Sequence, residues 1–401
     1  MINTYKQLLK NTTKSQRANI KITVGISGGV DSATTAYLLK EAGFNVRGVF
    51  IVCYDDRKQS CRGVKDKIDA YRVATYLNIP FETWDFQKSY KKKVIDYFVN
   101  SYKKGLTPNP DILCNNEIKF KLFLNKAIKT GADYVATGHY AKLVNSEELT
   151  VNSLRNEREG IKKLKAQIMG KQVAGSEGKL ANNLMLTIPK DKSKDQSYFL
   201  SGVSSSVYSK VLFPLGDYRK LDVRKIALLA KLPVATKKDS TGICFLEGIK
   251  MQDFLQKNIK QKTGKVVLDN SKKVIGEHNG IWFYTIGQRH GFTVNKYVGK
   301  PLYVLSKDYK KNILYVGEKP NLSSKYVLVK GKYAKKQYKN LYLRIRNLGS
   351  LYKIKNVESD GQNTKFVLFK AIESIAPGQF AVIYKKINSS YVVLKNYEIM
   401  V

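Results

Sequence analysis

Short apolar runs alternate with helix-length amphipathic segments along the first third of the chain. The run at 20–26 has the length of a buried strand, and the segment at 31–43 has the length of a helix that ends at Gly43. Strand and helix alternation of this kind predicts a doubly wound α/β fold with a parallel sheet. The other elements expected here are a strand at 46–52, helices at 66–77, 88–103 and 116–130, and a strand at 133–137.

Beyond this region the pattern changes twice. Residues 143–192 are polar and mixed in charge, which is typical of a surface insertion or a partly disordered loop. A helical pattern at 222–232 leads into a mixed segment, and from Pro301 onward short β-rich runs are separated by turn residues, which predicts a small β-barrel or sandwich. The expected division is a basic leader or tail at 1–20, a catalytic α/β domain at 21–212 with the insertion 143–192, a central α+β domain at 213–300 and a C-terminal β-barrel at 301–401.

The charge of the chain is strongly positive. Its 401 residues contain 71 Lys and Arg against 32 Asp and Glu, a formal net charge of +39. Such an excess indicates a polyanionic partner, most simply nucleic acid, although nucleotide bias in a genome produces the same composition. No apolar run is long enough to span a membrane, and the first residues lack the apolar core of a secretory signal.

The cysteines do not form a disulfide scaffold. There are four, at Cys53, Cys61, Cys114 and Cys244, and no Cys-x-x-Cys occurs among them. With only three histidines in the chain, a structural zinc site has little support, and we predict no bound metal cluster.

A glycine-rich motif follows the first predicted strand. In GISGGVDS (25–32), two adjacent glycines let the backbone turn tightly so that its N–H groups face an anion at the start of a helix. The motif lacks the Gly-Lys-Ser/Thr of a Walker A loop and the spaced glycines of a dinucleotide fold. It resembles instead the phosphate-binding loop of the PP-loop ATPases, which implies cleavage of ATP to AMP and pyrophosphate.

Two cysteines occur in polar segments that glycine or proline marks as loops, the prolines of the first being Pro108 and Pro110. TPNPDILCNNEIKF contains Cys114, and DSTGICF contains Cys244. A buried structural cysteine normally has apolar neighbours in sequence, so we expect both thiols to lie outside the packed core and to be reactive.

Seven motifs occur in an order that is similar to the tRNA-specific 2-thiouridylases, which place sulfur on the wobble uridine of certain tRNAs. They are GISGGVDS, TPNPDILCNNEIKF, ATGHYAK, KDQSYFL, KKDSTGICF, YTIGQR and APGQFAVIY, and the similarity extends from about residue 22 to about residue 385. It implies a PP-loop ATPase domain of the adenine nucleotide alpha-hydrolase type, a small central domain and a C-terminal β-barrel.

The resemblance also implies the functional residues. Cys114 would be the nucleophile, Cys244 the acceptor of a persulfide sulfur and Asp111 the acid/base residue, and the two cysteines would form a transient disulfide. ATP would be bound by Gly25, Ile26, Ser27, Gly28, Gly29, Val30, Asp31, Ser32, Ile51 and Gly138. The tRNA would be contacted by Asn109, Pro110, Asp111, Lys194, Asp195, Gln196, Arg344 and Ile345.

The implied chemistry names the cofactors and partners. ATP, with Mg²⁺ bridging its phosphates, would adenylate the C2 oxygen of uridine, and a persulfide donor (a cysteine desulfurase or sulfur carrier protein) would supply the sulfur. We expect no membrane partner and a monomer when free. The basic, acid-free segment 1–20 favours mitochondria, with the bacterial cytoplasm as the alternative.

Several features have alternative interpretations. His139 follows a predicted strand and is expected to be structural, and Cys53 and Cys61 are expected to be inert. Residues 319–357 combine lysines and arginines with tyrosines and no acid, which favours an RNA-binding face over a merely solvated one. The competing functions are another PP-loop ATPase, which would thiolate cytidine or adenylate a carboxylate, and a non-catalytic basic RNA-binding protein.

Overall fold

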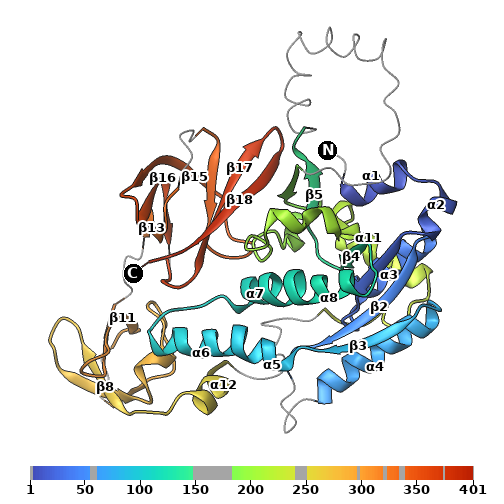
Figure 1. Ribbon diagram of the computed structural model, residues 1–401. Coiled ribbons are helices and arrows are strands. Elements are labelled where there is room, and N and C mark those ends of the chain that lie inside the picture. Colours follow the sequence, from blue (N-terminus) through green and yellow to red (C-terminus); the bar gives the residue numbers. More distant parts are fainter. Residues whose placement is uncertain are drawn as a thin grey trace. The chain divides into compact units, whose positions relative to one another are not determined.

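The chain folds as two compact units, each described in turn for the computed structural model (Figure 1). The first unit comprises residues 1–91, 111–241 and 382–395, and the second comprises 92–110, 242–381 and 396–401. The residues that the structure describes are 3–54, 61–147, 183–239, 251–295, 299–318, 323–333, 339–373 and 375–400.

The first unit is built on a parallel sheet. Its five strands have the order β3-β2-β1-β4-β7, and every neighbouring pair is parallel. The chain order therefore reverses between β1 and β4, which is the topological switch point at which such sheets bind ligands. The strands are β1 (Lys21–Gly25), β2 (Asn45–Val52), β3 (Phe81–Asp85), β4 (Tyr134–Thr137) and β7 (Val211–Leu212).

Helices cover both faces of this sheet. One core cluster joins α3 (Val30–Glu41) and α4 (Cys61–Tyr76) to Ile22 and Val24 of β1. A second cluster joins Phe123 and its neighbouring helical residues to Val49 and Val135. The predicted doubly wound α/β fold is thus confirmed, although the sequence pattern did not reveal β3 or β7. Further helical segments among the described residues of this unit are α5 (Gln87–Tyr90), α7 (Pro110–Leu113), η2 (Cys114–Phe123), α8 (Leu124–Lys129), η3 (Lys192–Lys194), η4 (Ser205–Lys210), η5 (Pro214–Asp217) and α11 (Lys220–Leu229). The first residue of α7 and all but the first residue of η1 (Lys91–Ile95) belong to the second unit.

The N-terminal segment is folded and is not an unstructured tail. It forms α1 (Thr4–Lys10) and α2 (Lys14–Ala18), and Tyr5 and Leu8 are buried in the first core cluster. The Asn3 side-chain amide donates to the Phe213 carbonyl oxygen at 2.8 Å, and the Arg17 guanidinium donates to that of Ala42 at 2.6 Å. Apolar side chains at helical spacing between the lysines explain this packing. The interpretation of the segment as a leader or tail rested on its charge and did not take these apolar positions into account.

The predicted insertion is bounded by paired strands. β5 (Lys142–Asn145) and β6 (Leu184–Thr187) are antiparallel, and β6 also pairs with β18 (Ser390–Glu398), which follows β17 (Phe380–Ile387). Leu143 and Leu186 are buried in the second core cluster, so the ends of the expected loop belong to the core. Residues 148–182 lie outside the described part of the chain.

The second unit contains two further groups of strands. The first has the order β10-β9-β8-β12-β11 and its own core around Val266, Val304 and Leu314. In the second group β16 lies between β13 and β15, and β15 also pairs with β14, all antiparallel. The elements are α6 (Asp96–Lys103), α12 (Met251–Asn258), β8 (Gly264–Leu268), β9 (Val274–His278), η6 (Ile281–Phe283), β10 (Thr293–Val294), β11 (Tyr303–Asp308), β12 (Ile313–Gly317), β13 (Ser323–Lys330), β14 (Leu341–Arg344), β15 (Tyr352–Ser359) and β16 (Asn363–Glu373).

The division differs from the expected domain boundaries in two places. β12 pairs with β8, so residues 303–317 belong with the central strands and not with the later β-rich region. α11 packs on α3 and belongs to the first unit, because Ala227 lies in the same core cluster as Ala36. Within the described residues, we find no helix whose length and apolar content would suffice to cross a membrane.

Candidate nucleotide and sulfur-transfer site

The glycine-rich loop lies at the switch point of the parallel sheet. It leaves β1 at Gly25, and α3 begins at Val30 with Gly29 as its N-cap, a residue without a side chain to occupy the first N–H groups. Ser32 Oγ accepts a hydrogen bond from Ser27 N at 3.1 Å and donates to the Gly29 carbonyl oxygen at 3.1 Å. These hydrogen bonds hold the loop in a conformation in which the N–H groups at the start of α3 can face a bound anion.

Gly28 is the residue that makes this turn possible. Its φ is +77°, a left-handed conformation that suits glycine, and a Cβ here would lie 2.3 Å from the Asp66 carbonyl oxygen. A second close approach comes from β4, since a Cβ at Gly138 would lie 2.7 Å from Ser32 N. Gly138 thus lies against the loop, whereas Ile51 packs half-buried at the end of β2. That both residues bind nucleotide stays a prediction.

Asp31 is the acidic residue of the glycine-rich motif, and its carboxylate accepts hydrogen bonds from two side chains that are distant in the sequence. Both of its carboxylate oxygens accept from Lys220 Nζ, at 2.7 and 2.8 Å, and Oδ1 also accepts from Tyr140 Oη at 2.8 Å. Burial and then the neighbouring Asp31 carboxylate raise the pKa of Tyr140 well above its usual range, so its hydroxyl stays protonated and donates. Lys220 was not predicted from sequence, where it is one of many lysines.

A second carboxylate, Asp239, forms ion pairs with three basic side chains. Lys194 Nζ and Lys220 Nζ each lie 2.9 Å from a carboxylate oxygen of Asp239, and Arg224 Nη2 lies 2.5 Å from one. Burial alone would raise the pKa of Asp239, but hydrogen bonds from Lys220 and Lys194 outweigh that effect and hold it well below its usual range. The KKDSTGICF motif was selected from the sequence because of its cysteine, and no role was predicted for Asp239.

Lys237 attaches the same stretch to the loop directly. Its ammonium donates to the Gly28 carbonyl oxygen at 3.0 Å and to Asp66 and Asp69 of α4 at 2.6 Å each. Burial alone would lower the pKa of Lys237, but the two carboxylates outweigh it and raise the pKa, so this lysine is charged throughout the neutral range.

Cys114 lies on a helix and not in a loop. The helix begins at Pro110, where the missing N–H of proline costs nothing, and continues as a π-helical stretch from Cys114 to Phe123. Cys114 is only 3% exposed, between the buried residues Ile112 and Ile118. The expectation that this thiol stays outside the packed interior is therefore wrong, because the segment forms a helix that is packed into the fold, with Ile118, Phe120 and Phe123 of the same helix buried as well. Cys244 lies outside the described residues, so its pairing with Cys114 stays a prediction.

The residue after Cys114 is buried with an unused acceptor. Asn115 is 4% exposed, and its Nδ2 donates to the Phe199 carbonyl oxygen at 3.3 Å. Its Oδ1 has no hydrogen-bond partner among the residues that the structure describes. A π-helical stretch and an orphaned acceptor beside a thiol are both typical of functional sites.

The other predicted tRNA contacts divide into distinct environments. Asn109 Nδ2 donates to Gln379 Oε1 at 3.4 Å, and Thr107 N donates to the Pro377 carbonyl oxygen, which brings the TPNPD and APGQF motifs together in the second unit. Asp111 is half-buried at the start of the helix. This contact between two motifs was not predicted from the sequence.

The KDQSYFL motif is partly structural. Lys194 is 39% exposed, but Asp195 is 1% exposed and accepts from Ser197 N, and Gln196 exchanges hydrogen bonds with the Tyr140 backbone. Arg344 and Ile345 of the second unit are 8% and 5% exposed, so little of their surface is open to direct tRNA contact.

His139 is enclosed behind β4, as a structural histidine would be. Its Nδ1 lies 2.7 Å from Thr137 Oγ1 and its Nε2 lies 3.4 Å from Lys119 Nζ. Burial, and next the Lys119 ammonium, lower the pKa of His139 well below its usual value. The ring is therefore neutral at pH 7.

This neutral histidine predicts a loss of stability in mild acid. The unfolded chain takes up a proton at His139 below about pH 6.5, whereas the folded chain does not, so protonation favours unfolding as the pH falls. Between pH 7 and 5.5 we expect the wild type to lose about 1 kcal/mol more unfolding free energy than His139→Asn, measured by urea denaturation. Burial also lowers the pKa of His278. Because His278 is present in both proteins, its contribution to the loss of stability cancels in the comparison. An equal loss in both proteins would contradict the buried neutral histidine.

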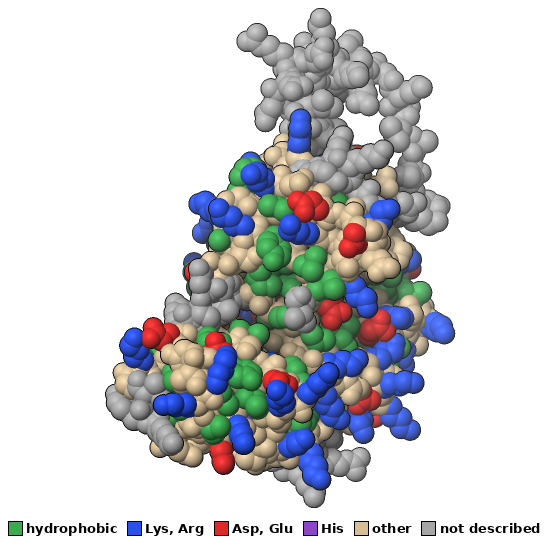
Figure 2. Space-filling model, turned by 90° about the vertical axis from the view of Figure 1, so that its left-hand side faces the viewer, with side chains coloured by type: hydrophobic (Ala, Val, Ile, Leu, Met, Phe, Trp, Pro, Cys, Tyr) green, Lys and Arg blue, Asp and Glu red, His purple; other side chains and the backbone are tan. Residues whose placement is uncertain are grey.

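The second unit carries exposed aromatic rings beside lysines. On β13 and β16, Lys365 Nζ lies 5.1 Å from the ring centre of Tyr326, and across β16 and β15 Lys353 Nζ lies 5.3 Å from that of Phe369. Tyr326 is 50% and Phe369 is 56% exposed. The face drawn in Figure 2 likewise shows many Lys and Arg side chains with few Asp and Glu between them.

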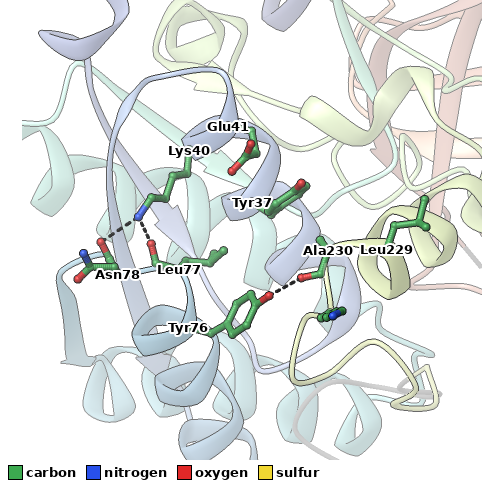
Figure 3. Close-up of a pocket in the computed structure, with 9 residues that line it drawn as sticks. Tyr37, Lys40, Glu41, Tyr76, Leu77, Asn78, Leu229 and Ala230 are labelled. Carbon is green, nitrogen blue, oxygen red and sulfur yellow. Dashed lines mark hydrogen bonds between the residues drawn. The ribbon is translucent and has the colours of Figure 1, made fainter.

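A cavity of about 360 Å³ lies elsewhere on the first unit (Figure 3). It is lined from the C-terminal ends of α3, α4 and α11, whereas the glycine-rich loop lies at the N-terminal end of α3. Lys40 Nζ there already donates to the carbonyl oxygens of Leu77 and Asn78, and Tyr76 Oη donates to that of Ala230 at 2.8 Å. Its polar groups are thus used within the fold, and it is not the nucleotide site.

A serine- and glycine-lined loop without a Walker lysine, at the switch point of a parallel sheet, defines the PP-loop class of ATP-using proteins. Comparison with protein families agrees, since the model described as "tRNA methyl transferase HUP domain" matches residues 20–248 and that described as "tRNA methyl transferase PRC-barrel domain" matches residues 252–318. The chain belongs to the tRNA-specific 2-thiouridylase family, as the relatives below establish.

Three relatives carry this assignment. The tRNA-specific 2-thiouridylase MnmA of Shouchella clausii is 43% identical over 306 residues, which are 76% of this chain and 74% of that protein. Those of Staphylococcus epidermidis RP62A and Lactiplantibacillus plantarum are each 42% identical, over 74% and 76% of this chain and 71% and 73% of theirs. Among solved structures, the U34-tRNA thiolase NcsA of Methanococcus maripaludis aligns over 64% of this chain and 73% of its own with 22% identity and a TM-score of 0.34, too low to bear on function.

Proposed function

We propose that this chain replaces the C2 oxygen of the wobble uridine of tRNA with sulfur, at the cost of ATP cleaved to AMP and pyrophosphate. The observation that carries the proposal is that one compact unit contains both the phosphate-binding loop and Cys114, in a chain whose relatives are named 2-thiouridylases. ATP use follows from the class of the loop, and the substrate follows from the relatives.

The first step is activation of the base. The C2 oxygen of uridine attacks the α-phosphorus of ATP and pyrophosphate leaves, which converts a poor leaving group into AMP. In this proposal the N–H groups at the start of α3 hold the phosphates, and Asp111, in the first turn of the Cys114 helix, acts as acid or base on the uridine. Asn109 and Pro110 contact the same base.

The second step delivers sulfur. The terminal sulfur of a Cys244 persulfide, loaded by a desulfurase or carrier protein, attacks C2 and AMP leaves, so that C2 is joined to Cys244 through an S–S bond. The Cys114 thiolate then attacks the Cys244 sulfur, this S–S bond breaks, the sulfur stays on C2 and a Cys114–Cys244 disulfide forms. In the alternative order, Cys114 attacks the Cys244 sulfur of the persulfide first, and the hydrosulfide released by forming the disulfide attacks C2 and displaces AMP. A two-electron thiol reductant then restores both thiols.

Mg²⁺ fits the residues at the loop. This ion is commonly held by one or two carboxylates together with substrate phosphates, and Asp31 provides a carboxylate beside the loop. It would neutralise phosphate charge when bound with ATP. No group of three or more metal-ligating side chains occurs within the described ranges.

The exposed rings and lysines of β13, β15 and β16 support tRNA binding. Aromatic faces stack on unpaired bases and lysines pair with phosphates, which suits a folded RNA with exposed loops. The predicted tRNA contacts stay predictions for Lys194, Asp195, Gln196, Arg344 and Ile345. The buried residues among them would act by holding the neighbouring backbone in position for the tRNA. A monomeric state and a mitochondrial location, with the bacterial cytoplasm as the alternative, also stay predictions.

Other reactions fit the residues less well. The descriptions of the matching family models mention methyl transfer, but a PP-loop and a pair of cysteines are the equipment of adenylation and sulfur transfer. Cytidine thiolation and carboxylate adenylation use the same loop but do not require the Asp111, Cys114 and Cys244 set. A non-catalytic RNA-binding protein would not need the left-handed turn at Gly28.

The test is a reconstitution with defined parts. The full chain is mixed with ATP, Mg²⁺, a persulfide donor and unmodified tRNA, and nucleosides and nucleotides are measured by mass spectrometry. We expect 2-thiouridine at the wobble position and one AMP for each thiolated base. Formation of 2-thiocytidine, or of AMP with no thiolated nucleoside from any tRNA, would overturn the proposal.

A further inference from the structure

The partner of Lys119 in the first unit is a neutral histidine. Lys119 lies half-buried in the π-helical stretch Cys114–Phe123, and its Nζ lies 3.4 Å from Nε2 of His139. Among the residues that the structure describes, it forms an ion pair with no carboxylate. Lys220 and Lys237 of the same unit, by contrast, each pair with two carboxylates. Keeping an unpaired charge partly out of water costs free energy, so the ammonium of Lys119 is suited to an anionic ligand.

His139 fixes the position of this ammonium. A neutral imidazole has one donor nitrogen and one acceptor nitrogen, and an ammonium can only donate. Nε2 of His139 therefore accepts from Lys119, and Nδ1 carries the proton and donates to Thr137 Oγ1 at 2.7 Å. The imidazole ring also packs against Phe120 and Phe213, whose ring centres lie 5.9 and 6.0 Å from its own. Thr137 and the two aromatic rings thus orient His139, which in turn orients Lys119.

These residues lie at the edge of the sheet where the phosphate-binding loop begins. Thr137 is the last residue of β4 and is paired in register with Gly25, the first residue of the loop. Gly138 follows it, and a Cβ there would lie 2.7 Å from Ser32 N at the start of α3. Lys119 is therefore held beside the loop, at the carboxyl edge of the strands where the chain order of the sheet reverses.

The same lysine belongs to the helical stretch that carries Cys114. Backbone hydrogen bonds of a π-helix join residues five positions apart, and Lys119 comes five residues after Cys114, so the two lie on adjacent turns. In the proposed function, uridine reacts with ATP at the α-phosphate and later with sulfur near Cys114. The α-phosphate must therefore be reachable both from the loop and from this stretch, and Lys119 is connected to both.

We propose that Lys119 is a catalytic residue whose ammonium binds the α-phosphate of ATP, and that His139 and Thr137 are its positioning residues. The inference rests on the proposed function for the identity of the nucleotide. It adds the group that holds the phosphate under attack. This contact with the α-phosphate is measurable without tRNA and without sulfur.

The role of Lys119 in the activation step is electrostatic. The C2 oxygen of uridine forms a bond to the α-phosphorus, and the bond from that phosphorus to the oxygen bridging to the β-phosphorus breaks. Pyrophosphate leaves with that electron pair, and the proton of uridine N3 passes to Asp111, the acid/base residue of the proposed function. Negative charge is spread over the remaining oxygens of the α-phosphate during this displacement, and a fixed ammonium stabilises it. Lys119 keeps its own protons throughout.

The test compares ligands that carry different parts of ATP. Calorimetry measures the affinity of the full chain for AMP, adenosine and pyrophosphate. We expect Lys119→Met to lose AMP affinity by about tenfold or more, as loss of a hydrogen bond to a charged group commonly does, and to bind adenosine and pyrophosphate as the wild type does. Lys119→Arg keeps the positive charge and should stay within about twofold of the wild type for all three ligands.

The positioning role has its own variant. His139→Phe keeps an aromatic ring against Phe120 and Phe213 but cannot accept a hydrogen bond from Lys119. We expect it to lose AMP affinity by about fivefold with adenosine affinity unchanged, since the ammonium is still present but is no longer held in place. A histidine that only supports the fold would change the affinities for AMP and adenosine together, and that result would overturn the positioning role.

Lys121 provides the matched control. It lies on the same π-helical stretch, its side chain is 54% exposed, and its Nζ lies 3.2 Å from Glu117. Lys121→Met removes the same charge from the same stretch and should bind all three ligands as the wild type does. In the reconstituted reaction at saturating ATP, Lys119→Met should release pyrophosphate about 100-fold more slowly, and Lys121→Met at the wild-type rate.

The outcomes separate the contact from a structural role and from the proposed function. Wild-type AMP affinity in Lys119→Met would overturn the proposal, and so would an equal loss of all three ligands or a wild type that binds AMP no more tightly than adenosine. Lys119→Gln is measured in the same way if Lys119→Met does not fold. A selective loss of AMP affinity in a chain that makes no 2-thiouridine would instead count against the proposed function and support the Lys119 contact.

Discussion

Gly28→Ala should abolish AMP formation, with a fall of about 100-fold or more in the reconstituted reaction. The added Cβ would meet the Asp66 carbonyl oxygen at 2.3 Å, and the φ of +77° is itself unfavourable for alanine by about 1–2 kcal/mol. The loop must shift to relieve the contact, and a shift of about 1 Å in groups that hold a reacting phosphate costs about 100-fold in rate. Analogue binding by calorimetry and AMP release are the measurements.

Gly131→Ala is the matched control for this variant. Gly131 lies in the same unit with a φ of +88°, but a Cβ there has no atom within 4 Å. It should therefore show the backbone penalty of about 1–2 kcal/mol in unfolding free energy and keep full AMP formation. Equal activity of Gly28→Ala and Gly131→Ala would mean that the turn at Gly28 does not serve the nucleotide.

Cys114→Ser and Cys244→Ser should each lose 2-thiouridine formation by more than about 1,000-fold, as removal of a nucleophile commonly does. Serine forms neither a persulfide nor a disulfide, so neither variant completes sulfur transfer. Pyrophosphate release should persist in both, because activation of the base precedes the use of either thiol, whereas AMP leaves only when sulfur displaces it from C2. Thiolated nucleoside, pyrophosphate and AMP are measured in the same samples.

Cys53→Ser supplies the control for these substitutions. Cys53 follows β2 and is half-buried, and we predict that it has no part in the reaction. It should thiolate tRNA at the wild-type rate. Because Cys114 is buried, the folding of Cys114→Ser is checked by its unfolding free energy. Full thiolation by both Cys114→Ser and Cys244→Ser would contradict the two-cysteine mechanism.

Local patterns succeeded where neighbouring residues decide the structure. The strand before Gly25, the turn at Gly28 and the helix from Val30 follow from apolar runs and backbone freedom, and all three were predicted. The Cys114 segment was predicted as a loop because of its two prolines. It is a helix because proline fits the first helical turn, and its apolar side chains then bury the thiol.

The glycine-rich loop, the two cysteine motifs and the family were determined by the sequence alone, because each depends on the identity and order of residues close together in the chain. Only the tertiary structure decided which distant charges meet. Lys220, Lys237 and Asp239 are ordinary surface residues by composition, yet the winding of α3, α4 and α11 around one sheet brings them to Gly28 and Asp31. Ion pairs act over a few ångströms in space without regard to sequence separation, so no local pattern could have revealed them.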